Sequence, residues 1–226
     1  MFKNLKKIIL GDRNGGRNLN YYYGRILVRA YGLKLDKSYS SINEDNILDW
    51  LTGYKKRGVY IDISANNPEN QNNTKLFYER GWTGVNIEPD VSGYEQFLKK
   101  RPDDINLNVG VGIGEVDYYE NPDHSYRNTC MKSFADEWIG TKWELKNKRK
   151  IKLKPLSEIF KENNLMNVDF IKIDVETFEH EVLKSNDWNR YKAAVLCIEG
   201  SGYNYLKKYG YRKVFWDGNN TYYKLK

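Results

Sequence analysis

The stretch that decides the fold is VYIDISANNP at residues 59–68, followed by TGVNIE at residues 83–88. Each stretch starts with a short run rich in β-branched and aromatic residues. An acid stands at or near the end of each run, Asp62 in the first and Glu88 in the second. The residues between them, 74–80, have the apolar spacing of a helix. A strand, a helix and a second strand in this order predict a parallel βαβ unit.

The same alternation continues along the chain and indicates a mostly parallel sheet covered by helices. The further strands are expected at 105–109, 168–174 and 193–199, and the further helices at 44–56, 94–100 and 178–184. The end of the chain differs, because two β runs, 211–216 and 221–225, flank the turn residues DGNN. They predict a terminal antiparallel hairpin. Dinucleotide dehydrogenases usually continue with further βα units, so this ending argues against them.

The length of 226 residues suits one domain with a small appendage. We expect a basic, irregular N-terminal arm over residues 1–42 and one domain over 43–226, with an insertion at about 114–154 where the alternation breaks. The net charge of +7 comes from residues 1–35, which hold eight basic residues against Asp12, and the rest of the chain is neutral. A second basic run, residues 142–154, has seven Lys and Arg against Glu144.

Composition excludes several classes of protein. Two cysteines and two histidines are too few for a disulfide framework or a Cys/His zinc site. The longest aliphatic stretches have only three residues, far fewer than a bilayer span requires. We therefore expect a cytoplasmic protein whose basic arm allows contact with the inner membrane surface.

Four acids stand where predicted strands end: Asp62, Glu88, Asp174 and Glu199. Ligands of open α/β sheets bind at this edge, and an acid after the second strand is placed to accept hydrogen bonds from ribose hydroxyls. The first turn, at residues 62–68, contains no glycine, whereas a pyrophosphate needs a glycine-rich turn. The acids would instead attract the sulfonium and ammonium groups of S-adenosylmethionine.

Four segments together resemble the FkbM family of methyltransferases. They are YIDISANNP at 60–68, TKLFYERGWTGVNIEP at 74–89, RPDDINLNV at 101–109 and FIKIDVETFE at 170–179. The resemblance covers roughly residues 58–200. It implies an α/β class I methyltransferase (Rossmann-like) fold, with a mostly parallel seven-stranded sheet and a C-terminal antiparallel hairpin.

The resemblance also implies S-adenosylmethionine as the donor and O-methylation of sugars in surface polysaccharides or natural products. By position, Asp62, Ser64 and Asn66 would line the methionine end of the cofactor, Glu88 the ribose and Asn108 the region near adenine. The chain departs from the family pattern at Ser64 and Thr177, where the family usually has glycine. A side chain at residue 64 restricts the turn and the approach of the cofactor.

Methyl transfer to a hydroxyl requires that the oxygen lose a proton, so a general base or a metal-bound alkoxide is expected. The candidate bases are Asp174, Glu176 and His124, with His180 as a further possibility. Glu176 and His180 are four residues apart in a predicted helix, a spacing that suits a metal or a solvated pair. Asp174, Glu176 and Glu199 could hold Mg²⁺ or bind acceptor hydroxyls, and we assign no metal.

The expected partner is a sugar or glycan acceptor, including nucleotide- or lipid-linked sugars, and the charge distribution argues against nucleic acid. An alternative is an inactive methyltransferase-like protein that binds anionic membrane or nucleic acid through the arm, in which YYYGR at 21–25 interleaves aromatic rings with charge. We favour an arm that packs on the domain and recruits an anionic substrate.

Overall fold

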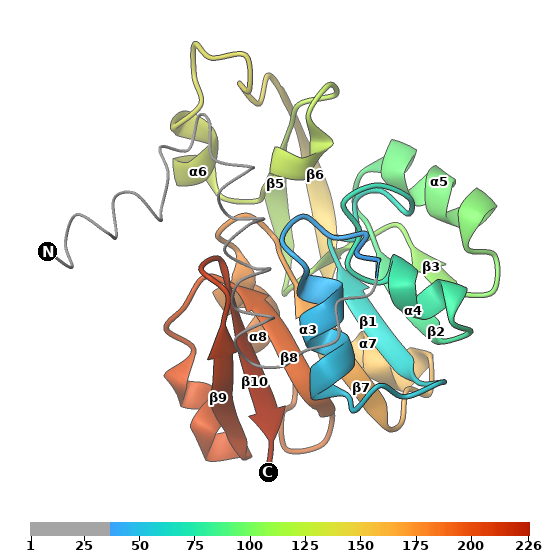
Figure 1. Cartoon of the computed structure of the whole chain (residues 1–226). Coiled ribbons are helices and arrows are strands. Elements are labelled where there is room, and N and C mark those ends of the chain that lie inside the picture. Colours follow the sequence, from blue (N-terminus) through green and yellow to red (C-terminus); the bar gives the residue numbers. More distant parts are fainter. Residues whose placement is uncertain (1–36) are drawn as a thin grey trace, which may run out of the picture.

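The structure, a computed structural model, describes residues 37–226, so most of the expected arm lies outside the described residues. Its centre is a seven-stranded sheet with the strand order β3-β2-β1-β7-β8-β10-β9 (Figure 1). The strands are β1 (Val59–Ile63), β2 (Thr83–Ile87), β3 (Ile105–Leu107), β7 (Val168–Ile173), β8 (Ala193–Glu199), β9 (Tyr211–Trp216) and β10 (Asn220–Leu225). The first five are parallel, and β10 runs antiparallel to both β8 and β9. The predicted sheet and terminal hairpin are confirmed.

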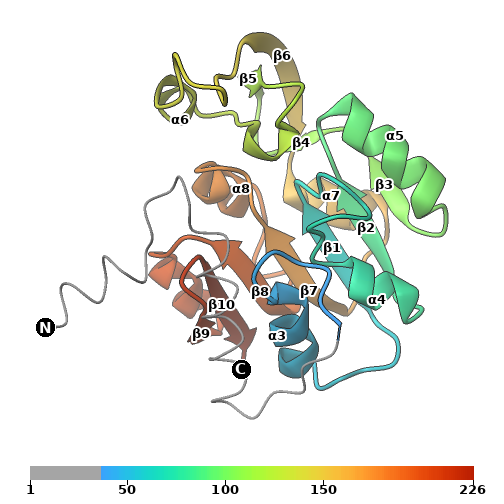
Figure 2. The same ribbon diagram turned by 45° about the horizontal axis from the view of Figure 1, so that its top comes forward.

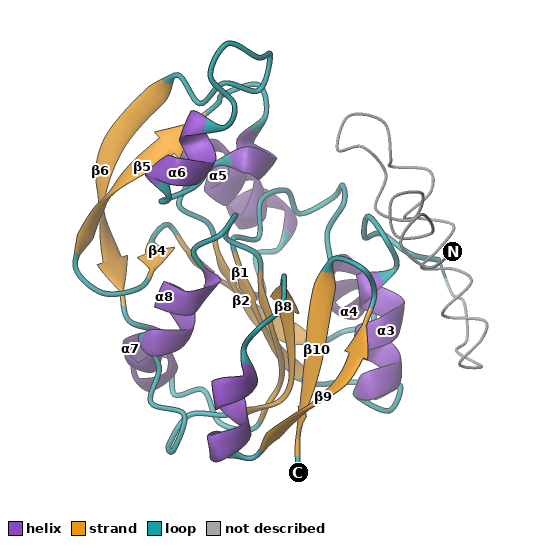
Figure 3. Cartoon of the chain, turned by 90° about the vertical axis from the view of Figure 1, so that its left-hand side faces the viewer, coloured by secondary structure: helices purple, strands orange, loops and turns teal. Residues whose placement is uncertain are grey.

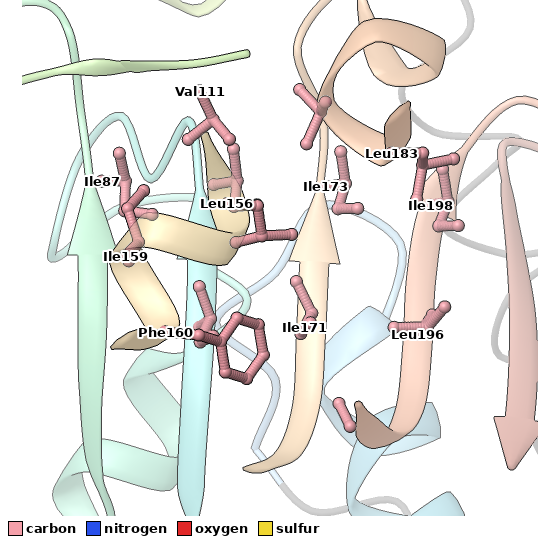
Figure 4. Close-up of a cluster of buried hydrophobic side chains, with 14 of the residues drawn as sticks. Ile87, Val111, Leu156, Ile159, Phe160, Ile171, Ile173, Leu183, Leu196 and Ile198 are labelled. Carbon is pink, nitrogen blue, oxygen red and sulfur yellow. The ribbon is translucent and has the colours of Figure 1, made fainter. Parts of the chain in front are cut away.

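Alternate side chains along the central strands enter two separate cores, which is why helices cover both faces of the sheet. On one face, Tyr60 and Phe170 pack with α3 (Glu44–Leu51) and α4 (Lys75–Glu79). On the other, Ile61 and Ile171 pack with α7 (Leu156–Glu162) and α8 (Glu179–Lys184). Figure 4 shows Ile171 in this core. The remaining helices are α5 (Val91–Lys100) beside β3 and α6 (Lys132–Asp136).

A second, three-stranded sheet stands above the carboxyl edge of the main sheet (Figure 3). It contains β4 (Gly110–Val111), β6 (Asn147–Lys154) and β5 (Glu115–Glu120), in that order. Figure 2 shows α6 beside it, on the side away from α5. Strands β5 and β6 form the two ends of the expected insertion, and α6 lies between them in the chain.

Most of the basic run at 142–154 is strand β6, which we had treated as irregular. Buried Ile151 and Leu153 alternate with lysines, so the run has the two-residue period of a half-buried strand. Lys148 pairs with Asp117 and Arg149 with Glu120, both across the ladder from β5. Much of the basic run is therefore neutralised within its own sheet.

The helix expected at 44–56 ends earlier, at Leu51. Thr52 donates its hydroxyl to the carbonyl of Leu48, and Gly53 adopts a φ of 75°, which stops the helix. Its predicted apolar side, Ile47, Leu48 and Leu51, is buried as expected. Within residues 37–226, no helix is long and apolar enough to cross a bilayer.

Candidate functional site

The turn after β1 closes without glycine. Ser64 and Asn66 both have left-handed backbone, with φ angles of 64° and 55°. The amides of Ser64 and Ala65 both donate to the carbonyl of Ile87, at 2.9 and 3.1 Å, which ties the turn to β2. Left-handed backbone costs a residue with a Cβ roughly 1–2 kcal/mol, so the hydrogen bonds hold Ser64 in a strained conformation.

Asp62 lies beneath this turn and is almost completely buried. Its Oδ2 accepts a hydrogen bond from the Thr74 hydroxyl at 3.0 Å, whereas its Oδ1 is buried with no partner among the described residues. Burial raises the pKa of Asp62, although the Lys172 ammonium on the neighbouring strand opposes that rise. Asp62 thus supports the turn and keeps one free acceptor.

The segment between the turn and α4 is fixed by Arg101, which sequence reasoning did not single out. The buried guanidinium donates to the Thr74 hydroxyl, the Asn72 side-chain oxygen and the Pro68 carbonyl, each at 2.7 Å. Arg101 follows α5, a long way along the chain from its partners. No local pattern could therefore have identified this role.

Glu88 joins the turns after β1 and β2. Its Oε2 accepts the Asn66 amide at 2.7 Å and its Oε1 accepts the Asp90 amide at 2.8 Å. Burial raises the pKa of Glu88 to about 7, although these two backbone hydrogen bonds act to lower it. Each oxygen retains lone-pair capacity beyond its single amide, so the carboxyl can still accept from a ligand.

Exposed Asn108 supports the same strand end, because its side-chain amide donates to the carbonyls of Glu88 at 2.8 Å and Pro89 at 3.2 Å. Next to it opens a small pocket that is partly open to solvent. The walls are mainly apolar and come from the ends of the parallel strands, the second sheet and the loop before α8. The lining residues are Ile63, Ser64, Ile87, Pro89, Val109, Gly110, Val111, Tyr118, Asn128, Thr129, Cys130, Val175 and Phe178.

Three carboxyl groups meet at the ends of β7 and β8. Oxygen atoms of Asp174, Glu176 and Glu199 all lie within 4.8 Å of one another. We call these three residues the acid cluster. Val175 and Phe178 in the loop that carries two of them also line the pocket, so the acid cluster adjoins it. The cluster is the group of described residues whose geometry would allow a divalent cation to bind.

The acid cluster carries little negative charge at neutral pH. Burial works to raise the pKa of Asp174, but Lys172, whose Nζ lies 2.8 Å from Oδ2, outweighs it and the pKa is lowered. The charge of Asp174, together with burial, raises the pKa of Glu199 to about 10. Burial, and then Asp174, raise the pKa of Glu176 to about 8. Asp174 is therefore ionised while the other two are mostly protonated.

The backbone after β7 corrects our placement of Glu176. Glu176 and Thr177 have left-handed φ angles of 51° and 77°, and α8 begins only at Glu179. Glu176 and His180 thus do not share a helical face, and the metal-binding or paired spacing proposed for them is wrong. His180 instead packs against the rings of Tyr203 and Tyr205.

Residues 124–130, which we call the cap segment, connect the two halves of the site, the turn after β1 and the acid cluster. Ser125 donates to the side-chain oxygen of Asn66 at 3.2 Å, and Thr129 donates to the carbonyl of Glu176 at 2.8 Å. The His124 ring packs edge-on against Tyr126. Within this segment, the charge of Arg127 opposes the rise in the pKa of Glu176 that burial and Asp174 cause. Arg127 is the second site residue that sequence reasoning missed.

Two solved structures resemble this chain at low sequence identity. A methyltransferase from Geobacter sulfurreducens is 12% identical, with a TM-score of 0.42 over 92% of this chain and 89% of that one. The METTL16 MTase domain is also 12% identical, with a TM-score of 0.43 over 92% and 78%. No curated protein sequence matches. The family described as "Methyltransferase FkbM domain" matches residues 62–213, which is more than half of the chain. The chain therefore belongs to the FkbM methyltransferase family.

Proposed function

We propose that the protein is an S-adenosylmethionine-dependent O-methyltransferase that acts on a hydroxyl of a sugar or glycan. The observation that carries the proposal is the acid cluster, in which one ionised carboxylate stands beside a pocket lined by Ile87 and Pro89, the two chain neighbours of Glu88. A hydroxyl acceptor needs a base close to the methyl donor, and this arrangement supplies one.

The residues around the pocket fit the proposed cofactor. Glu88 can accept hydrogen bonds from ribose hydroxyls while it keeps its two backbone amides. The unpartnered Oδ1 of Asp62 is an acceptor suited to an ammonium group. Ser64 and Asn66 would face the methionine end, and Asn108 would lie near adenine. The apolar pocket walls suit the flat adenine ring.

When bound, S-adenosylmethionine would supply a methyl group made electrophilic by its positive sulfur. Asp174 would accept the proton of the acceptor hydroxyl, because it is the ionised member of the acid cluster at neutral pH. Lys172 keeps Asp174 ionised through its 2.8 Å contact. The protonated carboxyl of Glu199 donates its hydrogen bond to Asp174, and that of Glu176 can donate one to another oxygen of the sugar and hold it in place.

His124 remains a second candidate for the base. It directly precedes Ser125, which binds Asn66, and its ring packs against Tyr126. The same cap segment reaches the acid cluster through Thr129. A His124→Asn variant separates the two candidates. If Asp174 is the base, this variant keeps most of its turnover, whereas Asp174→Asn does not.

The test is methyl transfer from label-bearing S-adenosylmethionine to nucleotide sugars, lipid-linked oligosaccharides and RNA, using the full chain. We expect label in a sugar fraction, and loss of that label in Asp174→Asn but not in the surface control Asp103→Asn. Calorimetric binding of S-adenosylmethionine and of NAD serves as the cofactor test. No label in any glycan fraction would overturn the acceptor class, and no binding of S-adenosylmethionine would overturn the cofactor.

A further inference from the structure

A second cationic group lies beside the acid cluster. The guanidinium carbon of Arg127 is 4.0 Å from the ring centroid of Trp138, 5.0 Å from that of Trp143 and 5.5 Å from that of Tyr126. The two tryptophan rings meet edge to face, with centroids 5.4 Å apart. Such contacts hold a guanidinium through its flat faces. They leave its N–H edges free for hydrogen bonds.

One of those donors is unsatisfied within the part of the chain that the structure describes. The Arg127 Nε is buried and has no hydrogen-bond partner within residues 37–226, and the same is true of the Trp138 Nε1. A buried donor without an acceptor costs about 1–3 kcal/mol, so two adjacent ones are a feature that folding alone does not explain. Arg149 in the same part of the molecule differs, because its donors bind Glu120 and the Pro89 carbonyl.

The position of Arg127 connects these donors to the proposed reaction. The next two residues, Asn128 and Thr129, line the pocket, and Thr129 binds the backbone of Glu176. The charge of Arg127 acts on the Glu176 carboxyl itself. Tyr126 is 36% exposed, so one of the rings around Arg127 is partly open to solvent, whereas Trp138 is buried. A molecule bound to Arg127 would thus lie within reach of the acid cluster.

We propose that Arg127 and the Trp138 indole N–H bind the anionic group of an acidic sugar, so that the acceptor is negatively charged. The inference rests on the proposed function for the role of that sugar as acceptor. A carboxylate or a phosphate matches the planar donor edge of a guanidinium. The faces of Trp143 and Tyr126 offer apolar surface against which the sugar ring packs. The anion is a carboxylate on the ring or a phosphate on the anomeric carbon.

The test measures binding by tryptophan fluorescence, because Trp138 and Trp143 lie at the site. The full chain is titrated with glucuronate, glucose 1-phosphate and neutral methyl glucoside. We expect at least one anionic sugar to bind about ten-fold or more tightly than the neutral one, as a charged hydrogen bond allows. Arg127→Gln should remove this preference, and Arg127→Lys should keep part of it. Arg190→Gln, which removes an exposed arginine stacked on Tyr191, should leave it unchanged.

Equal binding of all three sugars to the wild type, or the same preference in Arg127→Gln, would overturn the inference. Circular dichroism and S-adenosylmethionine binding confirm that each variant is folded. Binding of only one anionic sugar identifies the anion as a carboxylate or as a phosphate. The titration requires no turnover, so anion preference without methyl transfer to any sugar would leave the binding site intact and count against the proposed function.

Discussion

Two arginines organise the two halves of the site, and their surroundings differ in one respect. Arg101 holds the turn region, where its guanidinium lies 5.2 Å from the Phe97 ring and 5.3 Å from the Tyr78 ring. Arg127 holds the cap segment and lies against three aromatic rings. In both arginines, the flat faces of the guanidinium pack against aromatic rings. The N–H groups of Arg101 bind Thr74, Asn72 and Pro68, whereas the Nε of Arg127 has no partner within the described residues.

The difference separates a structural arginine from one that faces a ligand. A buried guanidinium whose two terminal amino groups are both bound inside the protein stabilises the fold. A guanidinium whose flat faces pack against aromatic rings but whose N–H edge lacks a partner is positioned to bind an acceptor atom of a ligand. The acid cluster lies where the two regions meet, so the turn region would orient the donor and the cap segment the acceptor.

Loss of Arg101 should have the largest effect. Arg101→Gln removes the hydrogen bonds to the Pro68 carbonyl, the Thr74 hydroxyl and the Asn72 side-chain oxygen and should lower the free energy of unfolding by roughly 3–5 kcal/mol. Urea denaturation followed by circular dichroism measures this change. Arg127→Gln serves as the matched variant and should cost about 1 kcal/mol or less. A larger loss of stability from the Arg127 change than from the Arg101 change would reverse the comparison.

Removal of the ionised carboxylate of Asp174, which lies between the two regions, should have the second-largest effect. Asp174→Asn should lower kcat on the order of 10²–10³-fold, because the acceptor hydroxyl loses its base. The KM for S-adenosylmethionine should change little, since Glu88 and the turn are untouched. Steady-state kinetics at saturating cofactor provide the measurement. Turnover within a factor of a few of the wild type would show that another group takes the proton.

The fold could be predicted from the sequence because its strands are short, apolar and bounded by acids. Strands β1, β8 and β9 have the predicted bounds. Strand β6 was missed because its many lysines obscured the alternation of Ile151 and Leu153. Acids at strand ends, such as Glu88 and Asp174, were found because their place follows from the sheet.

The rest of the site could not be predicted, because it depends on contacts between distant segments. The partners of Arg101 lie about thirty residues before it. The surroundings of Arg127 could not be predicted, because its guanidinium meets Trp138 and Trp143 only when α6 and the following loop fold over it. The left-handed backbone at Glu176, which removes it from α8, also has no signal in the residue type.

A pH titration sharpens the account of the turn region. The pKa of Glu88 is about 7 in the folded protein against an ordinary value of 4.5, so the folded state binds the proton more tightly. Stability should then fall as pH rises from about 4.5 to 7, with Glu88 contributing on the order of 1–3 kcal/mol. Glu88→Gln should flatten this fall, and Glu95→Gln, on the exposed side of α5, should not. An unchanged slope in Glu88→Gln would contradict the burial effect.

Relief of strain at the first turn should have the smallest effect. Ser64→Gly removes a side chain from left-handed backbone and should stabilise the protein by about 1 kcal/mol or less, because the flexible unfolded glycine offsets part of the gain. Thermal unfolding measures the shift. Asn66→Gly should gain less, since asparagine tolerates this backbone better and Asn66 loses its contact with Ser125. Destabilisation by Ser64→Gly would show that the serine side chain supports the turn.

The most direct test of the central claim is the chemical form of the methyl group transferred to an acidic sugar. We predict that the full chain transfers the labelled methyl group from S-adenosylmethionine to a sugar hydroxyl near Asp174. Arg127 holds the anionic group of the sugar away from the donor. The product is then an O-methyl ether that survives mild alkali. Label released by mild alkali would identify a methyl ester on the carboxylate, and that result would contradict the account.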